Sequence, residues 1–290
     1  MQNVSTNIFQ NQHLREIDDD IVSVGEIFRL QGDDELRDAE RLYLPKGTEG
    51  ANAIVLAASR GDLLGELTET APKTMLSVGG RSILERQLHN FRSFNIRESY
   101  VVRGFGKDCV NGPGVIPIDN DRFEETTEMW SLYLARHAIK KNTVISYGDI
   151  VFKKHVLNEL LSDEGDVTIL VDSDYRTGDD RFEYVSASRA YSSEILFREV
   201  TLKKISSELS EKEIDGEFVG LWRVSERGAE VVVAELERLA ELPSFERLRM
   251  SEFLAELQKK IPINIRYIRG SWVDVDSIVS LRMADGMTNA

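Results

Sequence analysis

Short apolar strands alternate with amphipathic helices between residues 51 and 172, and this alternation most constrains the fold. Strands are predicted at 51–57, 98–104, 115–118, 142–149 and 166–172. Between them, apolar residues recur at helical spacing in 82–94, 124–141 and 155–161. A chain with this pattern is expected to form an α/β layer structure, in which right-handed crossovers join the strands of a mostly parallel central sheet with helices on both faces.

The pattern changes between residues 181 and 225. Strands are predicted there at 184–188, 198–205 and 216–224, with little helix between them. This spacing predicts a β-rich excursion from the alternating core. Two helices at 228–242 and 247–260, a strand at 263–269 and the segment WVDVDS (272–277) follow.

Residues 1–50 differ from the rest of the chain. They are dense in charge, carry only short apolar clusters, and show helix-like spacing at 33–44 that ends at Pro45. The following KGTEG is typical of a linker. Because so short a segment cannot form a core, we expect an extension that packs on something else, followed by the main domain at 51–290.

Charge and cysteine content exclude several classes of function. The 290 residues carry 36 Lys and Arg against 50 Asp and Glu, a formal net charge of −14 at pH 7. This balance argues against nucleic acid or an anionic membrane surface as a partner, although local cations and a metal ion can still hold a nucleotide. The single Cys109 excludes an internal disulfide framework and a cysteine-based zinc site. No apolar run approaches the roughly 18 residues of a membrane span, so a cytoplasmic protein is expected.

A turn rich in small residues follows the strand at 51–57 and is a candidate phosphate site. Its candidate nucleotide-binding residues are Leu56, Ala57, Ala58, Ser59, Arg60, Gly61 and Asp62. Small side chains let backbone N–H groups approach an anion closely. Lys73 follows in Pro72-Lys73, and its compact charge suits a phosphoryl oxygen that becomes more negative during substitution. The alternative is a tight turn followed by a surface lysine.

Three aspartates form a candidate metal site. Asp149 ends the strand at 142–149, and Asp274 and Asp276 are two residues apart, so on a strand they project to the same side. Ligands of open α/β sheets bind beyond the carboxyl ends of the strands. Mg²⁺ is held by one or a few carboxylates together with phosphate oxygens and water. The three acids therefore predict a Mg²⁺ site, although a single aspartate at a strand end can equally cap a helix.

These motifs together resemble a known family. Residues 51–285 resemble the nucleotidyltransferase family that includes sugar-phosphate nucleotidylyltransferases, on the stretch LAASRGDLL (56–64) and PKTMLSVGGRSIL (72–84). The branch of phosphocholine and phosphonate cytidylyltransferases is more similar, on NDRFEETTEMWSL (120–132) and DVDS (274–277). The segments VDSD (171–174) and GEFVGLW (216–222) also resemble phosphonate cytidylyltransferases.

The resemblance implies a Rossmann-like nucleotidyltransferase fold and a Mg²⁺-dependent in-line transfer of a cytidylyl (CMP) group from CTP to a phosphonate oxygen, with release of pyrophosphate. Lys73 would be the catalytic residue, and Asp149, Asp274 and Asp276 would hold the metal. Besides the turn, the expected nucleotide-binding residues are Gly104, Phe105, Thr127, Glu128 and Ser131. The expected substrate-binding residues are Asn120, Trp130, Glu217 and Trp222.

Several of these roles have structural alternatives. Phe105, Trp130 and Trp222 could instead pack in the core. Glu128 stands where the family has asparagine and could accept a hydrogen bond from the cytosine amino group, or lie exposed on a helix. Ser59 and Leu63 replace a glycine and an arginine of the family's loop, and Arg60 could substitute for the missing arginine. Further candidates to meet a phosphonate dianion are Arg176, Arg181 and Arg198.

The segment EIFRLQGDDELRDAERLYLP (26–45) resembles the C-terminal tail of phosphoenolpyruvate mutases. This implies a bifunctional mutase/cytidylyltransferase of the fosfomycin-biosynthesis type, with residues 1–50 as mutase tail and linker, residues 51–290 as cytidylyltransferase domain, and a covalent link to a mutase domain. The expected acceptor is 2-hydroxyethylphosphonate. The alternatives are 2-aminoethylphosphonate, phosphocholine, a sugar 1-phosphate, or a non-catalytic nucleotide-sensing role.

Overall fold

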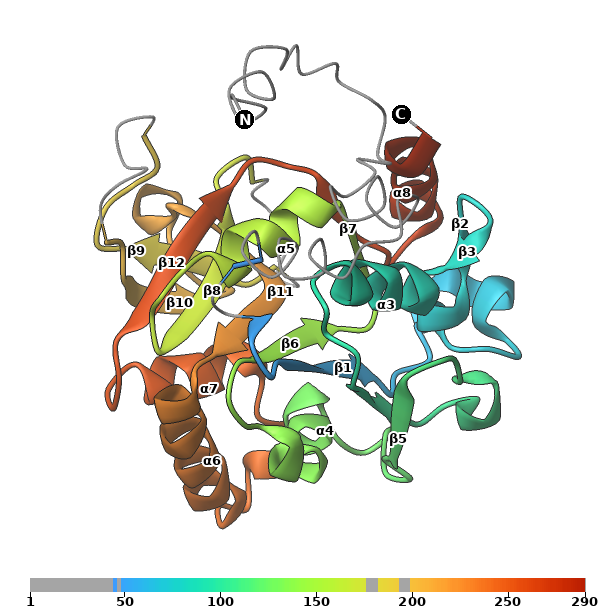
Figure 1. Ribbon diagram of the computed structural model, residues 1–290, viewed down its shortest axis with the longest axis horizontal. Coiled ribbons are helices and arrows are strands. Elements are labelled where there is room, and N and C mark those ends of the chain that lie inside the picture. The colour runs from blue at the N-terminus through green and yellow to red at the C-terminus, as the bar shows by residue number, and fades with distance from the viewer. Residues whose placement is uncertain (1–43, 46–47, 176–181, 193–198, 290) are drawn as a thin grey trace, which may run out of the picture. The chain divides into compact units, whose positions relative to one another are not determined.

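β1 (Asn52–Ala57) lies inside the main sheet, and all of its residues are buried. The computed structural model describes residues 44–45, 48–175, 182–192 and 199–289. β1 pairs in parallel with β4 (Ser99–Arg103) on one side and with β6 (Thr143–Tyr147) on the other. β4 in turn pairs in parallel with β5 (Val115–Asp119). The predicted α/β fold with a mostly parallel central sheet is confirmed (Figure 1).

Some of the predictions fall outside the described residues. They include the helix at 33–44 and nearly all of the mutase-like segment. The domain boundary at residue 50 therefore stays a prediction. Arg176, Arg181 and Arg198 also lie outside the described residues.

β11 (Gly216–Val224) departs from the parallel order. It runs antiparallel to β6 and β8 (Val167–Asp172), and its first residues pair with β9 (Tyr184–Ala187). β9 pairs antiparallel with β10 (Leu202–Ser206), whereas β12 (Ile263–Ile268) lies parallel to β8. The β-rich excursion predicted between residues 181 and 225 is therefore present.

Helices cover both faces of the sheet, as the alternation of strands and helices predicts (Figure 1). Along β1, Ala53 and Val55 pack in one apolar cluster with residues of α3 (Ile83–Ser93) and α5 (Lys154–Leu161). Ile54 and Leu56 pack in a second cluster with residues of three other helices, α4 (Glu128–Leu134), α6 (Glu226–Ala240) and α7 (Met250–Leu257). Neighbouring residues of a strand point to opposite faces, so β1 contributes to both cores.

Shorter elements surround the sheet. One ribbon pairs β7 (Ile150–Phe152) with β13 (Trp272–Asp274), and another pairs β2 (Ser77–Val78) with β3 (Arg81–Ser82). The helix α8 (Ile278–Asn289) follows β13 and was not predicted from the sequence. The described 3₁₀ turns are η2 (Asp62–Thr68), η3 (Lys73–Met75), η4 (Lys107–Cys109), η5 (Arg136–Ala138), η7 (Glu211–Glu213) and η8 (Phe245–Arg247). Among the helices that the structure describes, none has the length and apolar character needed to cross a membrane.

Side-chain caps set where two helices begin. At the start of α3, Ser82 Oγ accepts a hydrogen bond from the Glu85 backbone, and the Glu85 carboxylate accepts one from the Ser82 backbone. α4 begins at Glu128 rather than at residue 124, because Thr127 Oγ1 accepts a hydrogen bond from Met129 N at 3.3 Å. The predicted helices at 124–141 and 247–260 are thus too long, since α4 and α7 end earlier as well.

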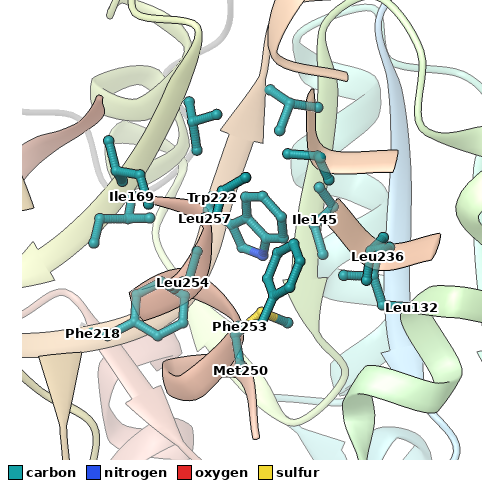
Figure 2. Close-up of a cluster of buried hydrophobic side chains, with 14 of the residues drawn as sticks. Leu132, Ile145, Ile169, Phe218, Trp222, Leu236, Met250, Phe253, Leu254 and Leu257 are labelled. Carbon is teal, nitrogen blue, oxygen red and sulfur yellow. The ribbon is translucent and has the colours of Figure 1, made fainter. Parts of the chain in front are cut away.

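Trp222 lies in the core between the sheet and the helices α6 and α7 (Figure 2). Its side chain has 0% exposure, and its ring centroid lies 6.3 Å from that of Phe253. On β11, Trp222 stands opposite Ile145 of β6 and Ile169 of β8. The alternation along β11 therefore directs the indole into the core, and the expected substrate contact of Trp222 is corrected to core packing.

Replacing Trp222 by alanine should lower the free energy of unfolding by about 3–5 kcal/mol, because a fully buried aromatic side chain leaves a cavity. Chemical denaturation measures this change. Leu242→Ala is the control, since Leu242 is 45% exposed and should cost far less. A Trp222→Ala protein as stable as the control would contradict the core assignment.

Candidate active site

A cavity of about 400 Å³ lies at the carboxyl ends of β1 and β6. Its walls come from the turn after β1, the segment between β5 and α4, the end of β6, the start of β9 and the start of α7. The lining residues are Leu56, Ala58, Ser59, Asn120, Phe123, Thr126, Thr127, Glu128, Ser131, Tyr147, Asp149, Glu183 and Arg249. The cavity is therefore where the strand-end rule places a ligand.

Lys73 and Asp149 form an ion pair beside this cavity. Lys73 is held by the turn after β1, since its backbone N–H donates to Arg60 O at 3.1 Å. Gly61 has a φ of +89°, and a Cβ there would lie 3.0 Å from the Lys73 Cβ and Cδ. The glycine of the small-residue turn thus leaves room for the lysine stem, which passes directly over it.

Asp149 is placed by a close contact between the ends of β6 and β1. Gly148 N donates to Leu56 O at 2.9 Å, and a Cβ on Gly148 would lie 2.7 Å from both Leu56 O and Ala57 Cβ. Only a residue without a side chain fits this approach. Asp149 therefore leaves the sheet beside the turn that follows β1. Ala57 packs against Gly148 and does not line the cavity.

Pairing between β7 and β13 brings the other two predicted metal ligands to the same place. Asp274 stands opposite Ile150, and Val275 N donates to Asp149 O at 3.0 Å. The Asp276 carboxylate accepts a hydrogen bond from Ser280 Oγ at 3.2 Å. Two segments separated by more than one hundred residues in the sequence therefore place three aspartates together.

The pKa of Lys73 is affected by all three aspartates. Burial disfavours the charged ammonium, but attraction to Asp149, then Asp274 and Asp276, outweighs it and raises the pKa of Lys73 above its ordinary value. Lys73 is therefore a fixed positive charge at neutral pH. It can neutralise a phosphate oxygen, but it cannot act as a proton acceptor there.

The aspartates suit a hard cation in their chemistry. Asp149 Oδ1 is buried and has no hydrogen-bond partner among the described residues. Carboxylate oxygens are the protein ligands that Mg²⁺ prefers. Among the described residues, however, no group of three acidic, histidine or cysteine side chains is gathered closely enough to hold a metal by itself. The donor set fits Mg²⁺ only with further oxygens from a ligand or water, and the metal stays a prediction.

Arg60 and Phe105 stack at the edge of the turn. The Arg60 Cζ lies 5.2 Å from the Phe105 ring centroid, and Arg60 Nε donates to Thr68 O at 3.1 Å. Phe105 N donates to Ala58 O at 3.0 Å, which ties the residue after Gly104 to the turn. Arg60 is thus held at the edge of the turn by Phe105 and Thr68.

Asn120 organises one wall of the cavity. Its amide donates to Ser131 Oγ at 3.1 Å and to Thr126 Oγ1 at 3.3 Å, and its oxygen accepts from Arg122 N at 3.0 Å. The side chain is 1% exposed. With both ends of its amide engaged, Asn120 shapes the wall rather than offering a free group.

Two glutamates and a tyrosine converge at another wall, next to the start of α7. Glu128 Oε1 accepts a hydrogen bond from Met250 N at 2.7 Å. Glu183 Oε1 accepts from Ser251 N, and its Oε2 accepts from Tyr147 Oη, both at 2.8 Å. Burial, and then the neighbouring Glu183, raises the pKa of Glu128 to about 7. Burial also raises the pKa of Glu183.

Sequence reasoning placed most of the site and missed part of it. The predicted residues that line the cavity are Leu56, Ala58, Ser59, Asn120, Thr127, Glu128, Ser131 and Asp149. Other predicted residues do not line the cavity but lie in the turn after β1 or in the segments hydrogen-bonded to it. They are Ala57, Arg60, Gly61, Asp62, Lys73, Gly104 and Phe105. The missed lining residues are Phe123, Thr126, Tyr147, Glu183 and Arg249. Tyr147 had a signal, its place at a strand end, but Glu183 and Arg249 had none.

The other predicted substrate-binding residues do not line the cavity. Trp130 packs against Tyr133 and Phe245, and the Arg122 guanidinium lies 5.2 Å from its ring centroid. Glu217 lies on β11 opposite Tyr184 of β9. The resemblance assigned these residues to the substrate site from their motifs alone. In the structure, Trp130 packs α4 against η8.

Comparison with known proteins identifies the domain. A family model described as a MobA-like NTP transferase domain matches residues 53–257. A CTP:phosphoglutamine cytidylyltransferase of Campylobacter jejuni is 26% identical over 258 residues, which cover 80% of this chain and 98% of that protein. A 2-aminoethylphosphonate cytidylyltransferase of Lancefieldella rimae is 29% identical over 109 residues, 36% of this chain and 44% of that protein.

Solved structures agree with the fold. The inositol-1-phosphate CTP transferase of T. maritima superimposes with a TM-score of 0.66 and covers 82% of this chain and 94% of its own. The two are 18% identical, so this likeness concerns the fold alone.

Replacing Glu128 by glutamine should flatten the pH dependence of stability. The folded protein binds the Glu128 proton more tightly than the unfolded chain, since the pKa rises from 4.5 to about 7. This contribution is present at low pH and is lost as the pH rises to about 7. Denaturation at several pH values should show the wild type losing more stability between about pH 5 and 7 than Glu128→Gln. The exposed Glu124→Gln should follow the wild type, and parallel curves for all three proteins would contradict the shift.

Proposed function

The chain belongs to the MobA-like NTP transferase domain family, and on that premise we propose that it transfers a cytidylyl group from CTP to an oxygen of a small phosphonate and releases pyrophosphate. The observation that carries the proposal is the convergence of Lys73 with Asp149, Asp274 and Asp276 beside the turn after β1. Relatives named as cytidylyltransferases, including one for 2-aminoethylphosphonate, support the choice of CTP and of a phosphonate.

The reaction needs charge neutralisation more than proton transfer. A phosphonate oxygen forms a bond to the α-phosphorus of CTP, the bond from that phosphorus to the bridging oxygen breaks, and pyrophosphate leaves with the electron pair. The attacking oxygen is already anionic, so no general base is required. Catalysis then consists of positioning and of electrostatic stabilisation. A lysine held in its charged form by three carboxylates is suited to this task.

The residues of the site receive the following roles in this proposal. The backbone amides of the 57–62 turn cradle the triphosphate, and Arg60 adds a cation at its edge. Lys73 neutralises negative charge on the α-phosphate and the incoming phosphonate. Asp149, Asp274 and Asp276 would hold Mg²⁺, which when bound screens the two anions from each other. Glu128 offers its second oxygen, Oε2, to the cytosine amino group, because Oε1 already accepts from Met250 N.

The acceptor that we propose is 2-hydroxyethylphosphonate, and 2-aminoethylphosphonate is the alternative. A quaternary ammonium such as that of phosphocholine favours an aromatic enclosure. Neither tryptophan expected at the substrate lines the cavity, since Trp130 stacks on Arg122 and Trp222 is buried, although Phe123 and Tyr147 do line it. The similarity of residues 26–45 to mutase tails supports a covalent link to a phosphoenolpyruvate mutase domain.

Pyrophosphate release with Mg²⁺ and CTP tests the proposal directly. The acceptors 2-hydroxyethylphosphonate, 2-aminoethylphosphonate, phosphocholine and glucose 1-phosphate are compared at equal concentration, and each reaction is repeated with EDTA in place of Mg²⁺. We expect release with the phosphonates, most with the hydroxyl compound, and none after chelation. CTP binding without release from any acceptor would favour the nucleotide-sensing alternative instead.

Lys73→Ala should lower kcat by roughly 10²–10³-fold, because one preorganised charge on the developing transition state is removed. Lys141→Ala is the matched control, since Lys141 is an exposed lysine outside the cavity. Thermal unfolding of both variants shows that the fold persists. A Lys73→Ala enzyme with near wild-type turnover would refute the catalytic role of Lys73.

A further inference from the structure

Two charged side chains of the cavity, Arg249 and Glu183, have no part in the cytidylyl transfer described above. Both line the cavity, and they come from segments on which the sequence offered no motif. Arg249 directly precedes α7, and Glu183 directly precedes β9. Their proximity to each other is the starting point for assigning them a ligand.

Arg249 presents a cation to the cavity. Some arginines of the described residues meet a carboxylate directly, as Arg122 meets Glu246 at 2.7 Å and Arg103 meets Asp119 at 2.7 Å. Among the described residues, no ion pair engages the exposed Arg249 guanidinium. A guanidinium offers donors in a planar fork that matches the paired oxygens of a phosphonate or phosphate group. An anion of this kind fits Arg249.

Glu183 presents an acceptor that is held in place. Ser251 N and Tyr147 Oη each donate to one of its two oxygens, which fixes the plane of the carboxylate. Each carboxylate oxygen can accept a second hydrogen bond. A buried carboxylate gains from a further donor, because burial removes the water that would otherwise supply one. The ligand group that fits Glu183 is therefore a hydrogen-bond donor.

The two groups lie close enough to act on one small molecule. Both line the same cavity, and Glu183 Oε1 accepts a hydrogen bond from Ser251 N, two residues after Arg249. The positive charge of Arg249 also acts to lower the pKa of Glu183, against the effect of burial. A ligand that suits both residues is a short acceptor with an anionic group at one end and a hydrogen-bond donor at the other.

We propose that Arg249 and Glu183 form the acceptor subsite, in which the Arg249 guanidinium binds the phosphonate group and the Glu183 carboxylate accepts a hydrogen bond from a hydroxyl or ammonium group at the far end of the acceptor. Tyr147 is a positioning residue, because it orients the carboxylate through its hydrogen bond to Glu183 Oε2. This inference rests on the proposed function and specifies its substrate class. The acceptor must carry both a phosphonate and a terminal donor.

Steady-state kinetics of Arg249→Gln tests the first half. The KM for the phosphonate acceptor should rise about 10-fold or more, since a hydrogen-bonded ion pair is lost, while the KM for CTP stays within about two-fold. Arg247→Gln is the matched control, because Arg247 is an exposed arginine two positions away that does not line the cavity. A rise in the KM for CTP with an unchanged acceptor KM would place Arg249 at the nucleotide and overturn the assignment.

Acceptor selectivity tests the second half. Wild-type kcat/KM is compared for 2-hydroxyethylphosphonate, 2-aminoethylphosphonate and ethylphosphonate, which lacks a terminal donor. We expect ethylphosphonate to be at least about 10-fold poorer than the better of the other two, and the ranking of those two identifies the donor. In Glu183→Gln the ratio of kcat/KM for the better donor-bearing acceptor to kcat/KM for ethylphosphonate should fall toward one. Equal use of ethylphosphonate by the wild type, or an unchanged ratio in Glu183→Gln, would overturn the role of Glu183.

The outcomes separate this inference from the proposed function. Turnover of no phosphonate by the wild type defeats the proposed function itself. Turnover with an unaltered acceptor KM in Arg249→Gln defeats only the subsite. Should Glu183→Gln fail to fold in a thermal melt, the wild-type comparison with ethylphosphonate and the exposed Arg249→Gln variant still decide the question.

Discussion

The ion pair between Lys73 and Asp149 is the interaction on which the site depends. It joins the segment after β6 to η3, which the turn after β1 holds through the hydrogen bond from Lys73 N to Arg60 O. Its geometry requires two close approaches, the lysine stem over Gly61 and Gly148 against Leu56 and Ala57. Since a lysine beside three carboxylates keeps its proton, Lys73 contributes a positive charge to the site rather than acting as a base.

The fold and the centre of the site could be predicted from the sequence because both rest on local patterns. β1 and β8 are buried throughout and mostly apolar, since both faces of the central sheet are covered, and that pattern is visible in the chain. Lys73 and the three aspartates could be identified because each lies in a short motif at a strand end. The α4 helix was predicted too long, since Thr127 begins it by a side-chain hydrogen bond that periodicity does not reveal.

The remainder depended on tertiary placement. Trp222 occurs in a segment that resembles a substrate site, yet the register of β11 turns its indole into the core. Glu183 and Arg249 belong to segments without a motif and meet only because α7 packs beside α4 and the start of β9. A glutamate that accepts from a helix N-terminus looks in sequence like any surface acid. The burial of Glu183 and its raised pKa depend on residues that are distant in the sequence and lie beside it only in the folded chain.

The pairing of β7 with β13 makes the site depend on a segment far along the chain, at residues 272–276. Lys73, Asp149 and most of the cavity wall are encoded in the first two thirds of the chain, whereas Asp274 and Asp276 follow nearly all of the sheet. A chain that stops before residue 274 lacks two of the carboxylates that converge on Lys73, and it also lacks Val275, which packs in a buried cluster with Val151. The proposed metal-dependent chemistry therefore requires this short ribbon, because the pairing of β7 with β13 brings the Asp274–Asp276 segment to Asp149.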